Sequence, residues 1–192
     1  PTSTPETKIN LHRGYYDDAE RESLNWWGND KRKIEGFDFL HKEKVKNLDL
    51  VVGGFYLKDE GFRYKEETTR KRVNFNTRYQ NQKIEGLYYG INANYLDNKT
   101  ASALIWDSYE EAYLPLNNAE TRTEGVIYNI DPFITYFNPN NNDKHRINNR
   151  YLSVKNDNET DADAEGQDNE SQSYYTEYQY QKSIESIQLN WT

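Results

Sequence analysis

The sequence predicts a mainly β protein, with a single antiparallel β-barrel or β-sandwich domain over residues 1–192 and a short N-terminal helix. One observation is a five-residue sequence pattern, which we call the glycine phrase. An acid or a glycine comes first, followed by a glycine, an apolar residue, a residue of any type and a second apolar or aromatic residue. It occurs five times, with central glycines at Gly36, Gly54, Gly61, Gly86 and Gly125. Each copy leads into the every-second-residue alternation that places side chains on one face of a strand. The other observation is that aromatic residues make up 15% of the chain, and their large amphipathic rings can cover a sheet.

The five glycine phrases are irregularly spaced, so they do not indicate a tandem repeat of fixed period. Glycine at the start of a strand permits a bulge, a sharp twist or the close approach of a neighbouring ring. We interpret the phrases as strand entrances in one curved sheet. The alternative is that some of these glycines open a ligand site.

The remaining elements follow from local residue types. Residues 1–10 are polar and are expected to form an extended arm. Residues 17–20 contain three acids that can cap a helix over 17–27, because carboxylates accept the free amides at a helix start. Strands are expected at 34–40, 48–57, 61–66, 71–79, 83–96, 101–114, 122–137, 150–155 and 174–191. Residues 97–100 are expected to form the turn of a hairpin between two of these strands.

An acidic surface loop is expected at residues 156–173. The chain carries a net charge of -8, and this segment has seven acids, no Lys or Arg and no apolar residue larger than Ala. Such a segment cannot bury a core. Its residues Asp161, Asp163 and Glu165 also match the first half of an EF-hand loop, although the twelfth position is Gln172 where a glutamate is required. A solvated loop is therefore the main interpretation and a weak calcium site at those three residues the alternative; no other cofactor is expected.

The compartment is inferred from absent residue types. The chain contains no Cys and no Met, which favours the mature form of a processed precursor in an extracytoplasmic location, secreted or surface-exposed. No apolar run approaches the roughly 20 residues that a spanning helix needs, so no membrane span is expected.

Aromatic residues are the candidate ligand-binding residues. They are Trp26, Trp27, Tyr175, Tyr178 and Tyr180. Alternation along a strand puts Tyr178 and Tyr180 on one face and Tyr175 on the other. Exposed rings favour contacts with a protein partner or a sugar ring. The alternative for the two tryptophans is that they anchor the predicted helix to the sheet.

The function expected from these features is non-enzymatic binding of a protein or glycan by a surface receptor or adhesin-like protein. A first alternative is a self-assembling subunit of an extracellular filament or virion coat, a homo-oligomer formed by strand exchange. A second is a β-fold glycoside hydrolase, which needs a carboxylate pair about 5–10 Å apart. The sequence does not single out such a pair, and no catalytic residue is assigned. Nucleic acid is an unlikely partner because acids such as Glu35, Glu66 and Glu67 lie beside the basic clusters at 31–33 and 70–72, and the whole chain is acidic.

Several short segments resemble strand patterns in the barrel of transferrin-binding-protein-B-like surface lipoproteins. They are residues 73–75, 83–87, 91–94 and 98–99, together with Gly53-Gly54-Phe55-Tyr56, which here precedes the other segments where the family has it after them. The resemblance implies a surface protein that binds a host protein or a haem carrier. No residue role is taken from it.

Overall fold

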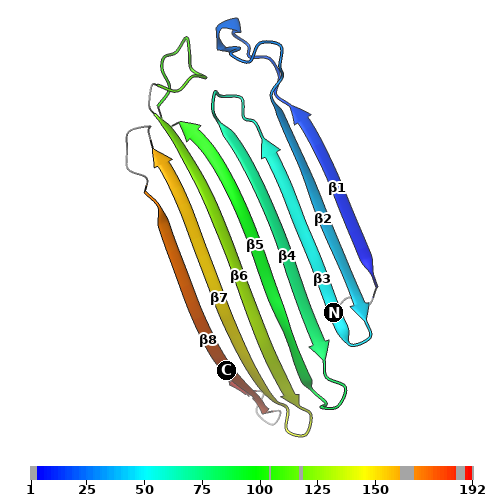
Figure 1. Ribbon diagram of the computed structural model, residues 1–192. Coiled ribbons are helices and arrows are strands. Elements are labelled where there is room, and N and C mark those ends of the chain that lie inside the picture. The colour runs from blue at the N-terminus through cyan, green and yellow to red at the C-terminus, as the bar shows by residue number, and fades with distance from the viewer. Residues whose placement is uncertain (1–3, 104, 117–118, 161–166, 185–188, 192) are drawn as a thin grey trace.

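The computed structural model describes residues 4–103, 105–116, 119–160, 167–184 and 189–191, and these form one antiparallel sheet (Figure 1). Each strand pairs with the next one along the chain, from β1 to β9. The strands are β1 (Glu6–Tyr15), β2 (Lys33–Val45), β3 (Leu48–Asp59), β4 (Glu67–Gln80), β5 (Leu87–Ala103), β6 (Glu120–Asn138), β7 (Asp143–Thr160), β8 (Asn169–Ile184) and β9 (Leu189–Trp191). The prediction of a mainly β, antiparallel protein is confirmed. Over the described ranges the strands form a single open layer, neither a closed barrel nor two packed sheets.

The predicted N-terminal helix over 17–27 is wrong. This segment contains only a single 3-10 turn, η1 (Glu22–Leu24). The turn is preceded by Arg21 in an extended conformation, with φ -101° and ψ 124°, and no side chain caps its free amides. The carboxylate of Asp17 accepts instead from the amide of Asp18, the next residue, at 3.0 Å. Asp17 therefore satisfies a local loop amide and does not start a helix.

Three strand boundaries also differ from the prediction. Residues 97–100 lie inside β5 and form no turn, because their polar side chains have cross-strand partners. The side chain of Asn98 accepts from Arg70 on β4 at 2.8 Å, and Lys99 pairs with Glu124 on β6. Most of the predicted strand 101–114 belongs to the β5–β6 connection, and residues 61–66 form the β3–β4 connection.

Two segments that were predicted to lie outside the strands, 1–10 and 156–173, contain strand residues. Half of the expected extended arm belongs to β1, which starts at Glu6. The expected acidic loop at 156–173 is shorter, because β7 continues to Thr160 and β8 begins at Asn169. The candidate calcium ligands Asp161, Asp163 and Glu165 lie outside the described residues.

The two ends of the sheet differ in the length of their connections. At the lower end in Figure 1 the chain turns back through residues 46–47, 81–86 and 139–142. At the upper end the connections are mostly longer, at residues 16–32, 60–66, 104–119 and 161–168. We call these the turn end and the loop end.

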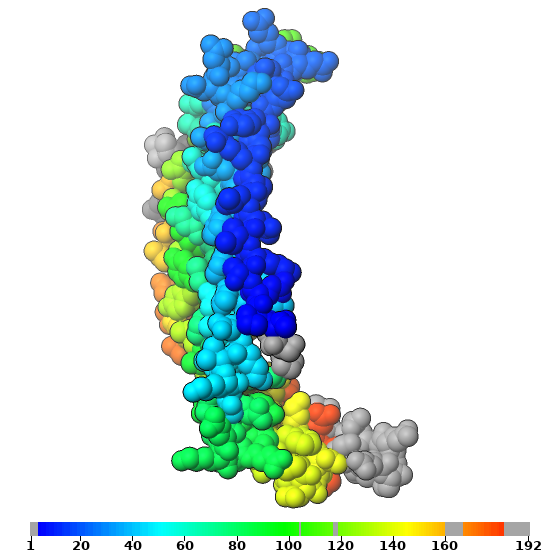
Figure 2. All heavy atoms as spheres, turned by 90° about the vertical axis from the view of Figure 1, so that its right-hand side faces the viewer, coloured from blue at the N-terminus to red at the C-terminus, as the bar shows by residue number. Residues whose placement is uncertain are grey.

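The sheet has almost no core. Figure 2 shows it from the β1 side as a narrow, bent slab. Its accessible surface is 13273 Å², whereas a compact monomer of 22.8 kDa exposes about 9,600 Å². Among the described residues the only buried apolar side chains are Leu24, Trp27 and Ala103. No helix in the described ranges is long and apolar enough to cross a membrane.

Candidate functional site

The strand register sorts the side chains of the sheet onto two chemically different faces. Residues that lie opposite each other on antiparallel strands point to the same side. Following the pairs Phe75 with Ala93, Ala93 with Ile130 and Ile130 with Tyr151 traces one face across four strands. We call it the apolar face. The other, which we call the polar face, is traced by Asn74, Asn94 and Asn129.

Exposed hydrophobic side chains are concentrated on the apolar face. Sixteen of the exposed large hydrophobic residues in strands lie there: Ile9, Leu11, Tyr15, Phe37, Val45, Val73, Phe75, Tyr89, Ile91, Tyr95, Ile130, Ile134, Ile147, Tyr174, Tyr178 and Tyr180. Only Phe137 and Tyr175 from that set lie on the polar face. An exposed apolar surface of this extent is unusual for a protein in water and is typical of an interaction surface. On β7 and β8 it is interrupted by Asn149 and Thr176, whose side chains bond to each other at 2.9 Å.

Tyrosines border the aliphatic part of this face on both sides. Along β6 the apolar face reads Tyr128, Ile130, Pro132, Ile134 and Tyr136. The two tyrosines are about 27 Å apart along the strand at the usual rise per residue. The pattern repeats on β5, where Tyr89 and Tyr95 enclose Ile91 and Ala93.

The bordering tyrosines contact one another across strands. The row nearer the loop end contains Tyr95, Tyr128, Tyr151 and Tyr174, and we call it the loop-side row. Ring centroids in this row are 5.8 Å apart for Tyr128 and Tyr151 and 4.9 Å for Tyr151 and Tyr174. The turn-side row contains Tyr79, Tyr89, Tyr136, Tyr178 and Tyr180. His145 joins the last three of these, with ring centroids at 6.3, 6.2 and 5.1 Å.

Beyond the loop-side row the same face becomes charged. Lys71 and Asp97 form an ion pair at 3.9 Å, and Lys155 and Asp157 form another at 3.4 Å. The hydrogen bond from Lys99 to Glu124 raises the pKa of the lysine. The apolar residues therefore form a band with a tyrosine row at each border and a charged zone between the band and the loop end.

The polar face consists mainly of amides and ion pairs. The facing residues Asn76, Asn92 and Asp131 follow each other across β4, β5 and β6. Arg150 donates to both carboxylate oxygens of Asp131, at 2.9 and 2.7 Å, which raises the pKa of the arginine. Arg78 pairs with Asp49 at 2.8 Å. This composition suits contact with water and polar solutes.

At the loop end, six aromatic rings from three connections pack into a small cluster. We call it the loop cluster; its members are Tyr16, Trp26, Trp27, Phe62, Tyr64 and Tyr113. Trp27 stacks on Tyr113 with centroids 6.2 Å apart, and the indole N–H of Trp26 donates to the carbonyl of Phe62 at 3.0 Å. The cluster holds the first, second and third long connections together.

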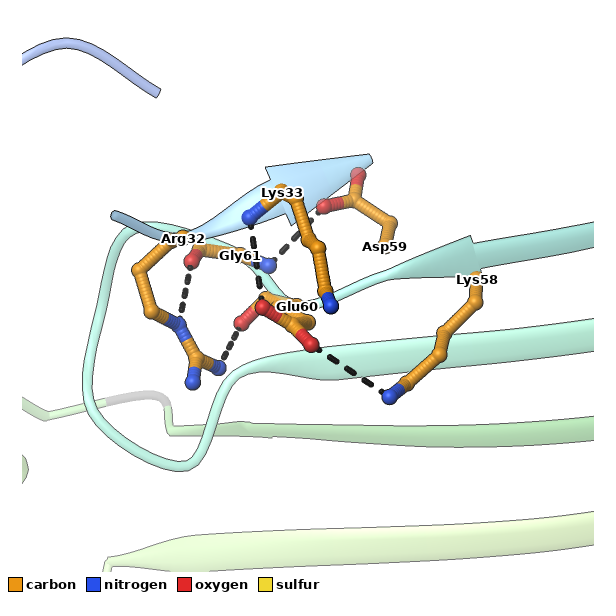
Figure 3. Close-up of polar contacts among 6 residues, drawn as sticks. All are labelled: Arg32, Lys33, Lys58, Asp59, Glu60 and Gly61. Carbon is orange, nitrogen blue, oxygen red and sulfur yellow. Dashed lines mark hydrogen bonds and ion pairs between the residues drawn. The ribbon is translucent and has the colours of Figure 1, made fainter. Parts of the chain in front are cut away.

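A polar network fixes the base of the loop cluster (Figure 3). Arg32 donates to the carbonyls of Gly61, at 3.1 Å, and Glu60. Burial works against the ionised form of Glu60, but hydrogen bonds from Lys58 and the backbone N–H of Lys33 lower its pKa overall.

Tyr16 ties the first long connection to the end of β3. Its hydroxyl donates to Asp59 at 2.7 Å, and Asp59 also accepts from the amide of Gly61 at 2.8 Å. Burial, and then the bond to Asp59, raise the pKa of Tyr16 to about 12.

The structure does not bring the five sequence-predicted binding residues together. Trp26 and Trp27 lie in the loop cluster, where Trp27 is only 8% exposed and anchors connections to each other. Tyr178 and Tyr180 lie in the turn-side row at the opposite end of the apolar face, whereas Tyr175 lies on the polar face. The predicted division of the three tyrosines between two faces is confirmed.

The apolar band is the feature that sequence reasoning missed. Residues 89–95 alternate strictly between apolar residues or tyrosine and glycine or asparagine, so a signal was present. Only the register shows that the alternations on successive strands align into one band. In the described part of the chain no group of His, Asp or Glu is arranged to hold a metal ion.

Comparisons of the chain with models of protein families, with curated proteins and with solved structures gave no match.

Proposed function

We propose that this sheet is part of the wall of a membrane-spanning β-barrel of the outer-membrane type, with its apolar face toward lipid and its polar face toward an aqueous interior. The observation that carries the proposal is the apolar band with a tyrosine row at each border, on a sheet that no second layer covers within the described residues. The role is structural and binding, not catalytic. The proposal narrows the expected extracytoplasmic location to the membrane itself.

The dimensions of the band support this role. Barrels of this kind carry an outward apolar band about 25 Å tall between two aromatic girdles. Tyr128 and Tyr136 are about 27 Å apart along β6, and a strand tilted by about 40° would reduce that to roughly 20 Å of height. Spanning needs only about 9–11 residues per strand. The longer strands, such as β6, would extend beyond the bilayer through the charged zone.

The connections support the same orientation. Outer-membrane barrels have short turns on one side of the membrane and long loops on the other. The turn end and the loop end differ in this way, and the charged zone lies on the loop side. The earlier expectation of no membrane span rested on the length of apolar runs, a measure that detects spanning helices and not strands with alternating residues.

The open edges set a requirement on the complete barrel. Within lipid every backbone amide and carbonyl needs a partner, so only closed sheets span membranes. Further strands must therefore pair with β1 and with the β8–β9 edge. They would come from elsewhere in a longer chain or from another copy, and the second source corresponds to the self-assembly alternative.

The loop end supports ligand binding as a second role. Tyr109 in the β5–β6 connection is 75% exposed, and the guanidinium of Arg21 lies 4.0 Å from the centre of its ring. We propose that the long connections contact a protein or glycan there, as in a surface receptor or adhesin. Binding to a glycan array should fall for Tyr109→Ala while the Tyr175→Ala control is unaffected; equal binding by both variants would remove this role.

A reconstitution experiment tests the membrane role. The denaturant-solubilised chain is diluted into buffer with or without phosphatidylcholine vesicles, and flotation is combined with far-UV circular dichroism. We expect the chain to float with the vesicles and to gain β structure only in their presence. A chain that folds as a stable monomer in buffer and stays out of the vesicle fraction would contradict the proposal.

A further inference from the structure

The polar face contains a hollow at the level of the loop-side row. It has a volume of about 260 Å³ and is lined by residues from β3, β4, β5, β6 and β7. Its apolar floor includes Phe55, Leu96 and Ile127. These residues lie in one row across the sheet, with Arg72 between Phe55 and Leu96. Small-molecule pockets usually measure about 300–1,000 Å³, so this hollow suits a ligand with a single ring.

Two arginines give the hollow a positive charge. Arg70 and Arg72 lie two residues apart on β4 and point to the same face, about 7 Å apart along the strand. Arg70 is bonded to Asn98, whereas Arg72 is exposed and forms no hydrogen bond or ion pair within the described residues. A bound anion would relieve the repulsion between the two guanidinium groups.

Acidic side chains border this hollow without lining it: Asp38 lies on the same face opposite Phe55, where its carboxylate is 4.0 Å from His12. None of the described residues that line the hollow is acidic. The acids that neighbour the lining residues in sequence, Asp97, Glu124 and Asp157, lie on the apolar face, where they pair with Lys71, Lys99 and Lys155. The charge of the two arginines therefore remains available to a ligand.

Glycine keeps the hollow open and positions an acceptor at its side. A Cβ atom at Gly125 would lie 2.7 Å from the side-chain oxygen of Asn156. The amide nitrogen of Asn156 donates to Asn169 at 3.0 Å, so its oxygen is left to accept from a ligand hydroxyl. Gly125 belongs to one of the five glycine phrases, and here it lines the hollow.

We propose that this hollow binds an acidic sugar unit. The anionic group would bind Arg72 and Arg70, a hydroxyl would donate to Asn156, and the apolar face of the ring would pack on Phe55, Leu96 and Ile127. The inference does not rest on the membrane proposal, because the hollow lies on the opposite face of the sheet.

Calorimetric titration with glucuronate tests the site at fixed ionic strength, with the chain folded either in buffer or in zwitterionic micelles, so that the result does not depend on the membrane proposal. Glucose is the ring without the anion, and acetate the anion without the ring. We expect saturable binding of glucuronate only. Arg72→Gln should weaken it by about tenfold or more, because a charge-assisted hydrogen bond is lost.

Arg146→Gln is the matched control. Arg146 is an exposed arginine on the same face near the turn end, and its loss changes the net charge equally. The affinity of the Arg146→Gln variant for glucuronate should equal that of the unmodified chain. Circular dichroism should show that the Arg72→Gln and Arg146→Gln variants are both folded. Equal effects of the two substitutions, equal binding of acetate and glucuronate, or no saturable binding would each overturn the proposal.

Discussion

Adjacent residues of one strand experience different surroundings in this molecule. Ile130 and Asn129 are neighbours on β6, but Ile130 lies in the middle of the apolar band and Asn129 on the polar face. A cation at the centre of a lipid-facing surface costs about 2–4 kcal/mol, whereas one on the inner face remains hydrated.

Ile130→Arg should therefore lower the free energy of unfolding in lipid by about 2–4 kcal/mol. The matched Asn129→Arg loses only the hydrogen bond from Asn129 to Asp131, at 2.9 Å, and should lower it by about 1 kcal/mol or less. Urea unfolding from phosphatidylcholine vesicles measures both. If the two penalties were equal, or if Asn129→Arg were the costlier, the assignment of the faces would be wrong.

Tyr16 provides a test at high pH. Its pKa is raised from 10.0 to about 12, so the folded state holds this proton more tightly than the unfolded state. The contribution of Tyr16 to stability is complete below pH 10 and is lost as the pH rises from 10 to 12.

The pKa values of Tyr151 and Tyr180 are raised as well, so the late phenol of Tyr16 should appear in absorbance at 295 nm as the difference between the unmodified chain and Tyr16→Phe. Asp59→Asn, which keeps an acceptor but removes the charge, should move this late step to lower pH. A difference titration of the unmodified chain and Tyr16→Phe without a late step would show that the Tyr16–Asp59 bond does not form.

Residue types predicted side-chain direction better than they predicted partners. Alternation assigned Tyr175 and Tyr178 to opposite faces, because direction along a strand is a local property. The same reasoning could not place Trp26 and Trp27, since their partners, such as Tyr113, come from another connection far along the chain.

At the scale of elements, polar residues were the main source of error. The segment 97–100 has the composition of a turn, yet it lies within β5 because Asn98 and Lys99 find partners on both neighbouring strands. The actual turn at residues 81–86 is built by Asn81, whose side chain accepts from the amides of Lys83 and Ile84 at 2.8 and 2.9 Å. Such partners depend on the register and cannot be read from composition.

Gly86 is the critical residue of that turn. It has φ +77°, and a Cβ atom there would lie 1.8 Å from the carbonyl oxygen of Phe137. Gly28 has φ +60° with nothing within 4 Å of its Cβ position. Substitutions at these two glycines therefore separate the cost of left-handed backbone strain, which both would carry, from the cost of a steric clash, which only Gly86 would carry.

Gly28→Ala should cost about 1–2 kcal/mol from left-handed strain alone. Gly86→Ala should cost about 1–3 kcal/mol more, because the β6 backbone must also move. Guanidinium unfolding of the micelle-bound sheet, followed by circular dichroism, compares them. Equal costs would mean that β5 and β6 do not approach closely at this turn.

The molecule as a whole is a sheet with two usable faces and little core. Hydrophobic residues make up only 34% of the chain, which is typical of a protein with little core to spare, and the large accessible surface agrees. Closure could not be predicted, because whether the edges at β1 and β9 meet depends on the number and curvature of strands. The aligned apolar band is likewise a property of the whole sheet.

The apolar band in contact with lipid is the central claim, and a cysteine scan of β6 from residue 126 to residue 136 tests it most directly. The chain has no cysteine, so each single-cysteine variant carries one environment-sensitive fluorophore. In vesicles, labels at even positions such as 130 and 134 should be quenched by nitroxide lipids, and labels at odd positions such as 129 and 131 by aqueous iodide. Iodide quenching that reaches both sets equally, with no period of two, would contradict the account.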